Sequence, residues 1–183
     1  MEPRDDELLG KARKGDQRAF RILVERYEGT VAATVIGMLG RGPEAEDVGQ
    51  EVFVRLFRSL DKFRGDSGLG TYLTRIAINQ SIKALNRRRS WSQRFVPWST
   101  TNEHDGASEG DADRIERSQL VTRALDRLKP DHRAVAVLRL MEGYSTKETS
   151  AILSVPEGTV MSRLSRAVRS LQEILRPEKE TIK

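Results

Sequence analysis

Residues 145–175 read STKETSAILSVPEGTVMSRLSRAVRSLQEIL, a stretch that predicts two helices separated by an enforced break. Ser145 and Glu148 fit a capping box, in which the serine hydroxyl accepts from the third helical amide and the glutamate accepts from the serine amide. The first helix is therefore expected to begin directly after Ser145. It has to end before Pro156, because a proline excludes the helical conformation from the residue that precedes it. A second, longer helix is expected over residues 157–175.

The second of these helices has one apolar face and one basic face. Arg163, Arg166 and Arg169 lie three residues apart on the side opposite the apolar positions. A short helix, a tight turn and a longer basic helix form a helix-turn-helix, whose second helix enters the major groove with its N-terminal residues. Ordinary amphipathic helices with a solvated charged face remain the alternative. The candidate base contacts are Thr159, Ser162, Arg163 and Arg166.

The residues before this helix-turn-helix show the apolar spacing of helices, interrupted by one polar segment. Residues 99–113 contain acidic side chains, no basic ones and almost nothing apolar, so they cannot bury enough surface to offset the entropy of ordering. The sequence therefore predicts a flexible linker over 95–113. It joins two small all-helical domains, which are expected at residues 1–94 and 114–183.

The first domain shows three helical runs. Its first run carries apolar residues at spacings of three and four, and glycines and a proline at 40–43 interrupt it. A second run covers 48–57 and a third covers 69–85. These runs predict one helical bundle, with no strand alternation. The stripe expected to form the core of the first run is Phe20, Leu23, Val24, Tyr27 and Val31.

Residues 75–94 contain six basic side chains and no acidic one. Such a run attracts phosphates with an affinity that falls as salt rises. It is equally compatible with a solvated helix end, where cations are favourable. Asn79, Gln80 and Asn86 lie on the same segment and can bond either base edges or backbone groups, and the sequence leaves both uses open.

An acidic cluster precedes the second helical run. Asp47 and Glu51 are four residues apart, which puts both carboxylates on one helix face. A metal site is one interpretation, but no histidine accompanies them and acidic residues are common in a first helical turn. A protein-docking face, apolar with an acidic rim, is favoured.

Composition narrows the function class. The 183 residues carry 32 Lys and Arg against 27 Asp and Glu, a net charge of +5 that favours polyanionic partners. No cysteine is present, which excludes disulfides and thiolate metal sites. The acidic N-terminus lacks the features of a signal peptide, so a soluble cytoplasmic protein is expected. No phosphate-binding glycine loop or nucleophile elbow appears, so the chain is not expected to be an enzyme.

The two motif sets, in this order, resemble the extracytoplasmic-function class of bacterial RNA polymerase sigma factors. The likeness covers about residues 16–175. Stretches 46–53 (EDVGQEVF), 71–73 (TYL) and 75–79 (RIAIN) resemble region 2 of that family. Stretches 142–145 (EGYS) and 158–167 (GTVMSRLSRA) resemble region 4.

The resemblance implies a role for each candidate residue. Asp47, Gln50, Glu51 and Phe53 would dock on the clamp helices of the polymerase beta-prime subunit, with the beta subunit as a further contact. Tyr72, Arg75, Asn79, Lys83 and Arg87 would meet the minus-10 promoter element, where a base leaves the stack and enters a pocket. Thr159, Ser162, Arg163 and Arg166 would bind the minus-35 element as duplex. An anti-sigma factor is expected as a regulator, and no cofactor, metal or small-molecule substrate is expected.

Some positions depart from the family pattern. Leu69 stands where an aromatic residue is usual and Tyr72 where tryptophan is common, which bears on the minus-10 contacts. Met161 replaces a common Lys or Arg, so one phosphate or base contact is expected to be missing. The main rival function is a stand-alone helix-turn-helix regulator, which would bind palindromic duplex as a dimer without polymerase. A purely structural adaptor would leave both basic helices unexplained.

Overall fold

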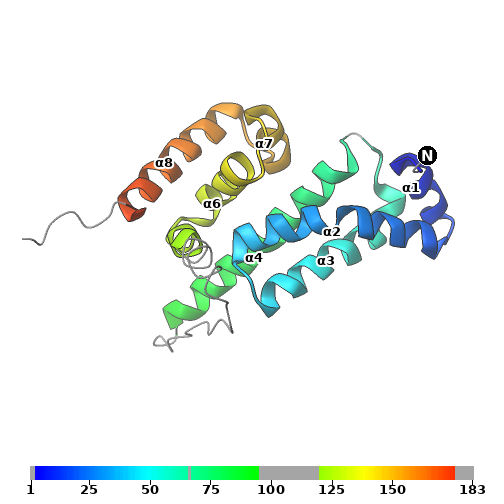
Figure 1. Ribbon diagram of the computed structural model, residues 1–183, viewed down its shortest axis with the longest axis horizontal. Helices are drawn as coiled ribbons and strands as arrows, with labels where there is room; N and C mark the ends of the chain where they lie inside the picture. The colour runs from blue at the N-terminus through cyan, green and yellow to red at the C-terminus, as the bar shows by residue number, and fades with distance from the viewer. Residues whose placement is uncertain (1–2, 66, 95–119, 176–183) are drawn as a thin grey trace, which may run out of the picture.

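A computed structural model describes residues 3–65, 67–94 and 120–175, and every regular element in these ranges is helical (Figure 1). The all-α fold predicted from the sequence is confirmed for this part of the chain. The expected linker at 95–113 lies outside the described residues. In the described ranges, no helix is both long and apolar enough to span a membrane.

The first half of the chain forms a four-helix bundle. Asp16 caps the helix that begins at Gln17, because its side chain accepts hydrogen bonds from the amides of Arg18 and Ala19. Gly40, at φ 77°, ends that helix in a conformation that favours glycine, and Pro43 begins the next one. The helices are α1 (Asp5–Arg13), α2 (Gln17–Leu39), α3 (Pro43–Ser59) and α4 (Leu69–Arg94), with a single 3-10 turn, η1 (Leu60–Lys62), after α3.

The predicted apolar stripe of α2 does form the centre of this bundle. Leu23 and Val31 are buried, and Phe20, Val24 and Tyr27 are half-buried around them. α3 contributes Val52 and Leu56, and α4 contributes Leu73 and Ile78, all fully buried. Together these side chains fill the space between α2, α3 and α4.

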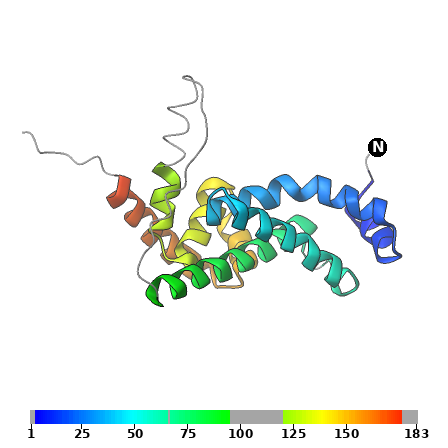
Figure 2. The same cartoon turned by 90° about the horizontal axis from the view of Figure 1, so that it is seen from below.

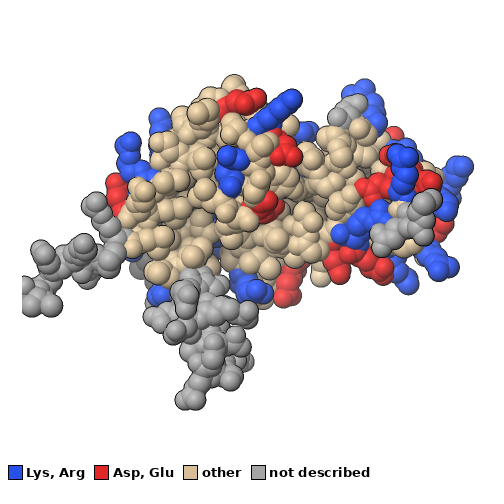
Figure 3. Space-filling view, turned by 45° about the horizontal axis from the view of Figure 1, so that its top comes forward, with Lys and Arg blue, Asp and Glu red and all other residues tan. Residues whose placement is uncertain are grey.

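Helix α1 was not predicted by the sequence. Leu8, Leu9 and Ala12 bury its apolar side against the bundle, and Arg13 donates from Nε to the carbonyl of Leu60 at 2.9 Å. Asp5 accepts hydrogen bonds from Arg26 and Tyr27 on α2. Figure 3 shows charged side chains gathered densely at this end of the molecule.

The second half contains the predicted helix-turn-helix and the helices that support it. Residues 120–126 are helical, and the run expected around 135–141 divides into an α-helix and a π-helical turn in which the amide of Glu142 bonds the carbonyl of Val137 at 3.0 Å. α8 contacts α6 and α7 and lies at the outer edge of the molecule (Figure 1). The elements are α6 (Pro130–Ala136), η2 (Val137–Met141), α7 (Thr146–Leu153) and α8 (Glu157–Leu175).

The two halves pack against each other, a feature that the sequence did not predict. α4 runs along the lower edge of the view in Figure 2 and contacts both α6 and α7. Val137 packs so closely on α2 that a Cβ added at Gly37 would lie 2.9 Å from its Cγ1 atom. Val137, Leu138 and Ile152 therefore belong to the same buried cluster as the core of the first bundle.

Arg133 forms the polar centre of this packing. Only 1% of its surface is exposed, and its Nε donates to the carbonyl of Gly37 at 3.0 Å. Its Nη1 also pairs with the carboxylate of Asp126. Burial lowers the pKa of Arg133, and the hydrogen bond and charge of Asp126 oppose that shift. A buried guanidinium thus joins α6 to the C-terminal end of α2.

Candidate nucleic-acid and protein interfaces

The turn between α7 and α8 is fixed by side chains on both sides. The predicted capping box is present: the Ser145 amide donates to Glu148 Oε2 at 2.8 Å, and the Glu148 amide donates to Ser145 Oγ at 3.2 Å. Ser154 adopts the left-handed conformation, with φ 55° and ψ 44°, and so ends α7. Ser150 Oγ then donates to the carbonyl of Val155 at 2.6 Å, which braces the turn. The local geometry is that of a helix-turn-helix.

Two of the four predicted base contacts lie on the open face of α8. Ser162 and Arg166 are exposed, and the Ser162 hydroxyl donates back to the carbonyl of Thr159 at 3.1 Å. Thr159 is half-buried. Arg163 is directed toward α6, where it pairs with Asp131 at 3.1 Å, and its side chain is 24% exposed. Arg163 is therefore tied to the supporting helix in this structure.

The open face of α8 also contains residues other than the four predicted base contacts. Met161 is 63% exposed, the largest exposure of an apolar side chain on this helix, and Ser165 and Arg169 are also exposed. Val160 and Ala167 occupy the buried side. Periodicity identifies the buried side correctly, but the chemical role of an exposed methionine does not follow from a pattern of apolar spacing.

The region where α6 meets α8 is electropositive. Partial burial lowers the pKa of His132, and the neighbouring cations Arg166, Lys129 and Arg163 lower it further, while Asp131 opposes them. Arg166, Lys129 and Arg163 thus surround His132 with positive charge, and together they give this surface a positive potential. Such a potential attracts the phosphates of duplex DNA.

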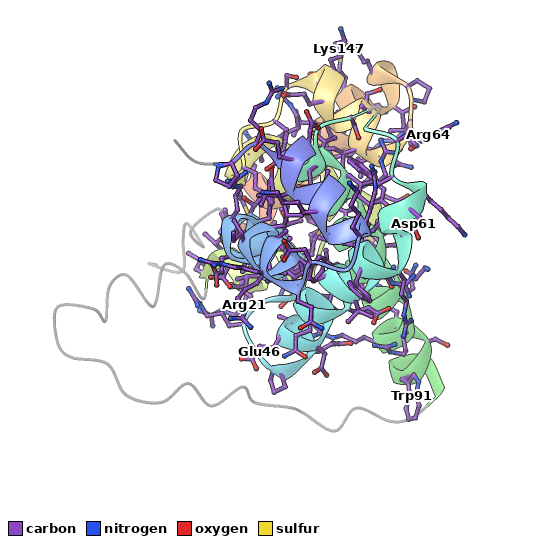
Figure 4. The ribbon with its side chains drawn as sticks, turned by 90° about the vertical axis from the view of Figure 1, so that its right-hand side faces the viewer. Arg21, Glu46, Asp61, Arg64, Trp91 and Lys147 are labelled. Atoms are coloured by element: carbon purple, nitrogen blue, oxygen red, sulfur yellow. The ribbon has the colours of Figure 1, made fainter. Side chains whose placement is uncertain are left out.

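The predicted residues of α4 share one stripe but differ in their surroundings. Tyr72 contacts Ser59 Oγ at 3.0 Å, and its ring lies 4.8 Å from that of Phe63. Asn79 and Lys83 are exposed. Arg87 pairs with Glu44 of α3 at 3.1 Å. Near the C-terminal end of the same helix, Trp91 projects from the molecule (Figure 4).

The fifth residue of this stripe contacts the second half of the molecule. Arg75 donates from Nη2 to the carbonyl of Ala151 on α7 at 2.7 Å. Beside it, Thr74 Oγ1 lies 3.1 Å from Tyr144 Oη, directly before α7. The N-terminal part of the α4 stripe is thus partly covered by α7.

Helix α3 presents an acidic and apolar face, as the sequence predicted. Asp47 and Gln50 are exposed, and Glu46 points outward from the first turn of this helix (Figure 4). Glu51 pairs with Arg55 at 2.8 Å along the helix. Phe53, by contrast, is half-buried and packs on the core.

An aromatic residue that the sequence prediction missed supplies the exposed apolar part of this face. Phe57 is 59% exposed, and its ring stands edge-on to that of Phe20 at 5.3 Å. Val54 is exposed on the same helix. In the ranges that the structure describes, no group of three or more His, Asp or Glu side chains is arranged to hold a metal ion.

Two family models match the chain in the order of the two halves. The model described as Sigma-70 region 2 matches residues 23–91, and the model described as Sigma-70, region 4 matches residues 118–171. The ECF RNA polymerase sigma-E factor of Escherichia coli strain K12 is 35% identical over 182 residues, which cover 94% of this chain and 95% of that protein. The chain belongs to the ECF family of RNA polymerase sigma factors. The resemblance derived from the motifs is confirmed.

Other relatives of this sigma factor agree with the assignment. The RNA polymerase sigma-H factor of Pseudomonas aeruginosa is 33% identical over 94% of both chains. The structure of CnrH in complex with the cytosolic domain of CnrY superposes with a TM-score of 0.66 at 29% identity, covering 93% of this chain and 96% of CnrH. RpoE of Bartonella quintana, in complex with the anti-sigma factor NepR, gives 0.68 at 25% identity, covering 87% and 98%.

Proposed function

We propose that this sigma factor binds core RNA polymerase and directs initiation at promoters that carry two recognition elements. The observation that supports the proposal most strongly is the presence of region 2 and region 4 in order, with a helix-turn-helix whose second helix keeps an open basic face. The function requires binding surfaces and no catalytic residue. We assign residues 1–94 and 114–183 to the two recognition domains, and we assign the protein to the cytoplasm, where polymerase and promoters are found.

We assign core-polymerase docking to the acidic and apolar face of α3. Asp47, Gln50 and Glu51 supply polar and charged groups, and Phe57 supplies exposed aromatic area next to Phe20. Interfaces typically bury such an aromatic anchor inside a polar rim. Phe53 supports this face from the core rather than from its surface. The partner surface is proposed to be the clamp helices of the beta-prime subunit, with the beta subunit as a further contact.

We assign minus-10 recognition to the stripe of α4. Asn79 is free to bond the edge of an unstacked base, and Lys83 is free to meet a phosphate. Tyr72 offers an aromatic surface beside them. Arg75 and Arg87 have to exchange their present partners, the Ala151 carbonyl and Glu44, for DNA phosphates. Exposed ion pairs contribute only about 0 to 1 kcal/mol, so the exchange at Arg87 costs little.

We assign minus-35 recognition to the open face of α8. Ser162 and Arg166 are positioned to reach base edges, because a recognition helix contacts the major groove through its N-terminal residues. Thr159 and Arg163 lie closer to the supporting helices, so their contribution is proposed to be support of the helix and contact with the DNA backbone. Arg163 can turn from its ion pair with Asp131 toward a DNA phosphate.

We also propose control by an anti-sigma factor. Two similar solved structures contain a second protein, CnrY in one and the anti-sigma factor NepR in the other. A regulator of this kind would cover the exposed part of the α3 face or of the α4 stripe and so exclude polymerase or DNA.

Run-off transcription with purified core polymerase and a genomic fragment library tests the proposal. Wild type should produce promoter-specific transcripts only when core polymerase is present. Asn79→Ala should reduce transcript by about tenfold with little loss of duplex binding, and Arg166→Ala should weaken duplex binding by about tenfold. Arg21→Ala removes an exposed cation from α2 and serves as the matched control.

The same experiment separates the rival function. A stand-alone helix-turn-helix regulator would bind palindromic duplex without polymerase and would not change the start sites of core enzyme. Specific binding by the isolated chain, together with no polymerase association, would overturn the proposal in favour of that rival.

A further inference from the structure

Met161 is an exposed apolar side chain in the middle of a polar recognition surface. It is the fifth residue of α8, and 63% of its surface is accessible to solvent. The side of α8 that packs on α6 and α7 is formed by other residues, including Val160 and Ala167. Met161 therefore contributes little to the packing of this domain, and its side chain is available for a contact outside the chain.

The residues around Met161 leave it room to reach a flat surface. Positions three and four residues away along a helix lie on the same face, and here they are Glu157, Gly158, Leu164 and Ser165, of which Leu164 is half-buried. Gly158 has no heavy atom within 4 Å of an added Cβ, so the space above the first turn of α8 is open. Two of these four neighbours, Gly158 and Ser165, are small, so they leave Met161 exposed on both sides along the helix.

The chemistry of methionine restricts what Met161 can recognise on DNA. A thioether is a weak acceptor and has no donor, so it cannot bond a phosphate or the acceptor atoms of guanine. Its unbranched, polarisable chain adapts to apolar surfaces. The one apolar group that the major groove displays is the 5-methyl group of thymine.

We propose that Met161 reads the 5-methyl group of a thymine in the upstream promoter duplex. The inference rests on the proposed function, because it requires α8 to enter the major groove of that element. A packed methyl group contributes about 0.8 kcal/mol, which corresponds to about a fourfold difference in affinity between thymine and its demethylated analogue.

Substitution of deoxyuridine for thymine tests this directly, since it removes only the methyl group. The preferred upstream sequence is first selected with the complex of core polymerase and wild-type chain from a randomised duplex. Each thymine of that sequence is then replaced in turn, and affinity is measured by competition. Wild type should lose about fourfold at one position, while Met161→Ala should bind the thymine and deoxyuridine duplexes equally.

Two further variants control the experiment. Met141→Ala removes a methionine of similar exposure from the end of η2 and should retain the wild-type response. Met161→Arg should change the selected base at that position from thymine to guanine, because arginine bonds guanine at two atoms. Thermal unfolding followed by circular dichroism should be equal for Met161→Ala and wild type.

The outcomes separate a failure of the Met161 contact from a failure of the proposed function. If the wild-type complex is insensitive to deoxyuridine at every position, or if Met161→Ala keeps the full response, the role of Met161 is wrong and the proposed function stands. If the complex shows no preference for any upstream sequence, the proposed function itself fails at the minus-35 element.

Discussion

At the scale of single residues, the turn of the helix-turn-helix contains a conformation that its side chain disfavours. Ser154 has φ 55°, and it is the one non-glycine residue with positive φ in the described ranges. The left-handed conformation costs an L-residue on the order of 1 kcal/mol, because its Cβ approaches the following carbonyl. Ser150 and Val155 hold the turn in place through their hydrogen bond, so the cost is offset locally.

Ser154→Gly is therefore expected to raise the free energy of unfolding by about 1 kcal/mol, since glycine adopts this conformation without strain. Urea denaturation measures the change. Ser165→Gly provides the matched control on the exposed face of α8, where glycine should lower stability by about 0.5 kcal/mol. Equal effects at the two positions would contradict the conformational explanation.

Glu142 adds a dependence of stability on pH. Its Oε2 accepts from Thr34 Oγ1 of α2 at 3.0 Å, while Oε1 is buried with no hydrogen-bond partner among the described residues. Burial raises the pKa of Glu142 above its ordinary value of 4.5, and the hydrogen bond from Thr34 opposes the shift. Ionisation is thus less favourable in the folded chain than in the unfolded chain, and stability falls as pH rises from about 4.5 through the raised pKa.

The variant Glu142→Gln remains neutral, so its stability relative to wild type should increase as the pH is raised through that window. Denaturation of both proteins between pH 4.5 and pH 7 checks this. His132 acts in the opposite direction, because its lowered pKa makes stability fall as pH drops below 6.5. Its contribution is present in both proteins and cancels in the difference. Parallel pH curves would show that Glu142 ionises freely.

At the scale of elements, two phenylalanines of helix α3 differ in their exposure to solvent. Phe53 faces the core and Phe57 faces solvent, although both belong to the same apolar run. Phe57→Ala is expected to weaken binding to core polymerase by about tenfold or more, because a truncated aromatic anchor typically costs over 1 kcal/mol. Competition binding with labelled core enzyme provides the measurement.

The control for α3 is Leu120→Ala, which removes an exposed apolar side chain of similar size from the other half of the chain. It should bind core polymerase as wild type does. Wild-type affinity of Phe57→Ala would show that docking uses another surface.

Much of the helical architecture is predictable from the sequence, since local rules govern it. The capping box at Ser145, the break before Pro156 and the buried stripe around Leu23 all follow from spacing and backbone chemistry. α1 escaped prediction because it has only nine residues and its N-cap, Arg4, makes no side-chain hydrogen bond. The π-helical turn η2 also escaped, since one extra residue in a turn has no signature in apolar spacing.

The residues of the candidate site could be predicted from the sequence, but the directions in which their side chains point could not. Asn79, Ser162 and Arg166 are exposed as expected. Arg163 and Arg75 instead bond Asp131 and the Ala151 carbonyl, contacts between elements that no local pattern encodes.

At the scale of the whole molecule, Arg133 couples the two halves. Its side chain is fully buried and bonds both Asp126 and the carbonyl of Gly37. A sequence pattern assigns such an arginine to a solvated helix face, so only the packing of α6 on α2 explains its burial.

Arg133→Ala is expected to lower the free energy of unfolding by about 2 kcal/mol, because it leaves the Gly37 carbonyl buried without a charged donor. Hydrogen exchange should show faster opening of both α2 and α6. Asp126→Asn keeps an oxygen that can accept from Arg133 and should cost less than about 1 kcal/mol, because the side chain of Asp126 is itself 51% exposed. Loss of protection confined to α6 would mean that the halves fold independently.

The close approach of Gly37 and Val137 makes the contact between the two halves sensitive to the size of the side chain at residue 37. A methyl group at residue 37 would collide with a stiff, branched side chain at 2.9 Å and act as a wedge between the halves. Alanine is otherwise the most favourable residue for a helix, so the same change would strengthen α2 by itself. Gly37→Ala is therefore expected to weaken the contact between the two halves, and selections for variants with separated halves should return to this position.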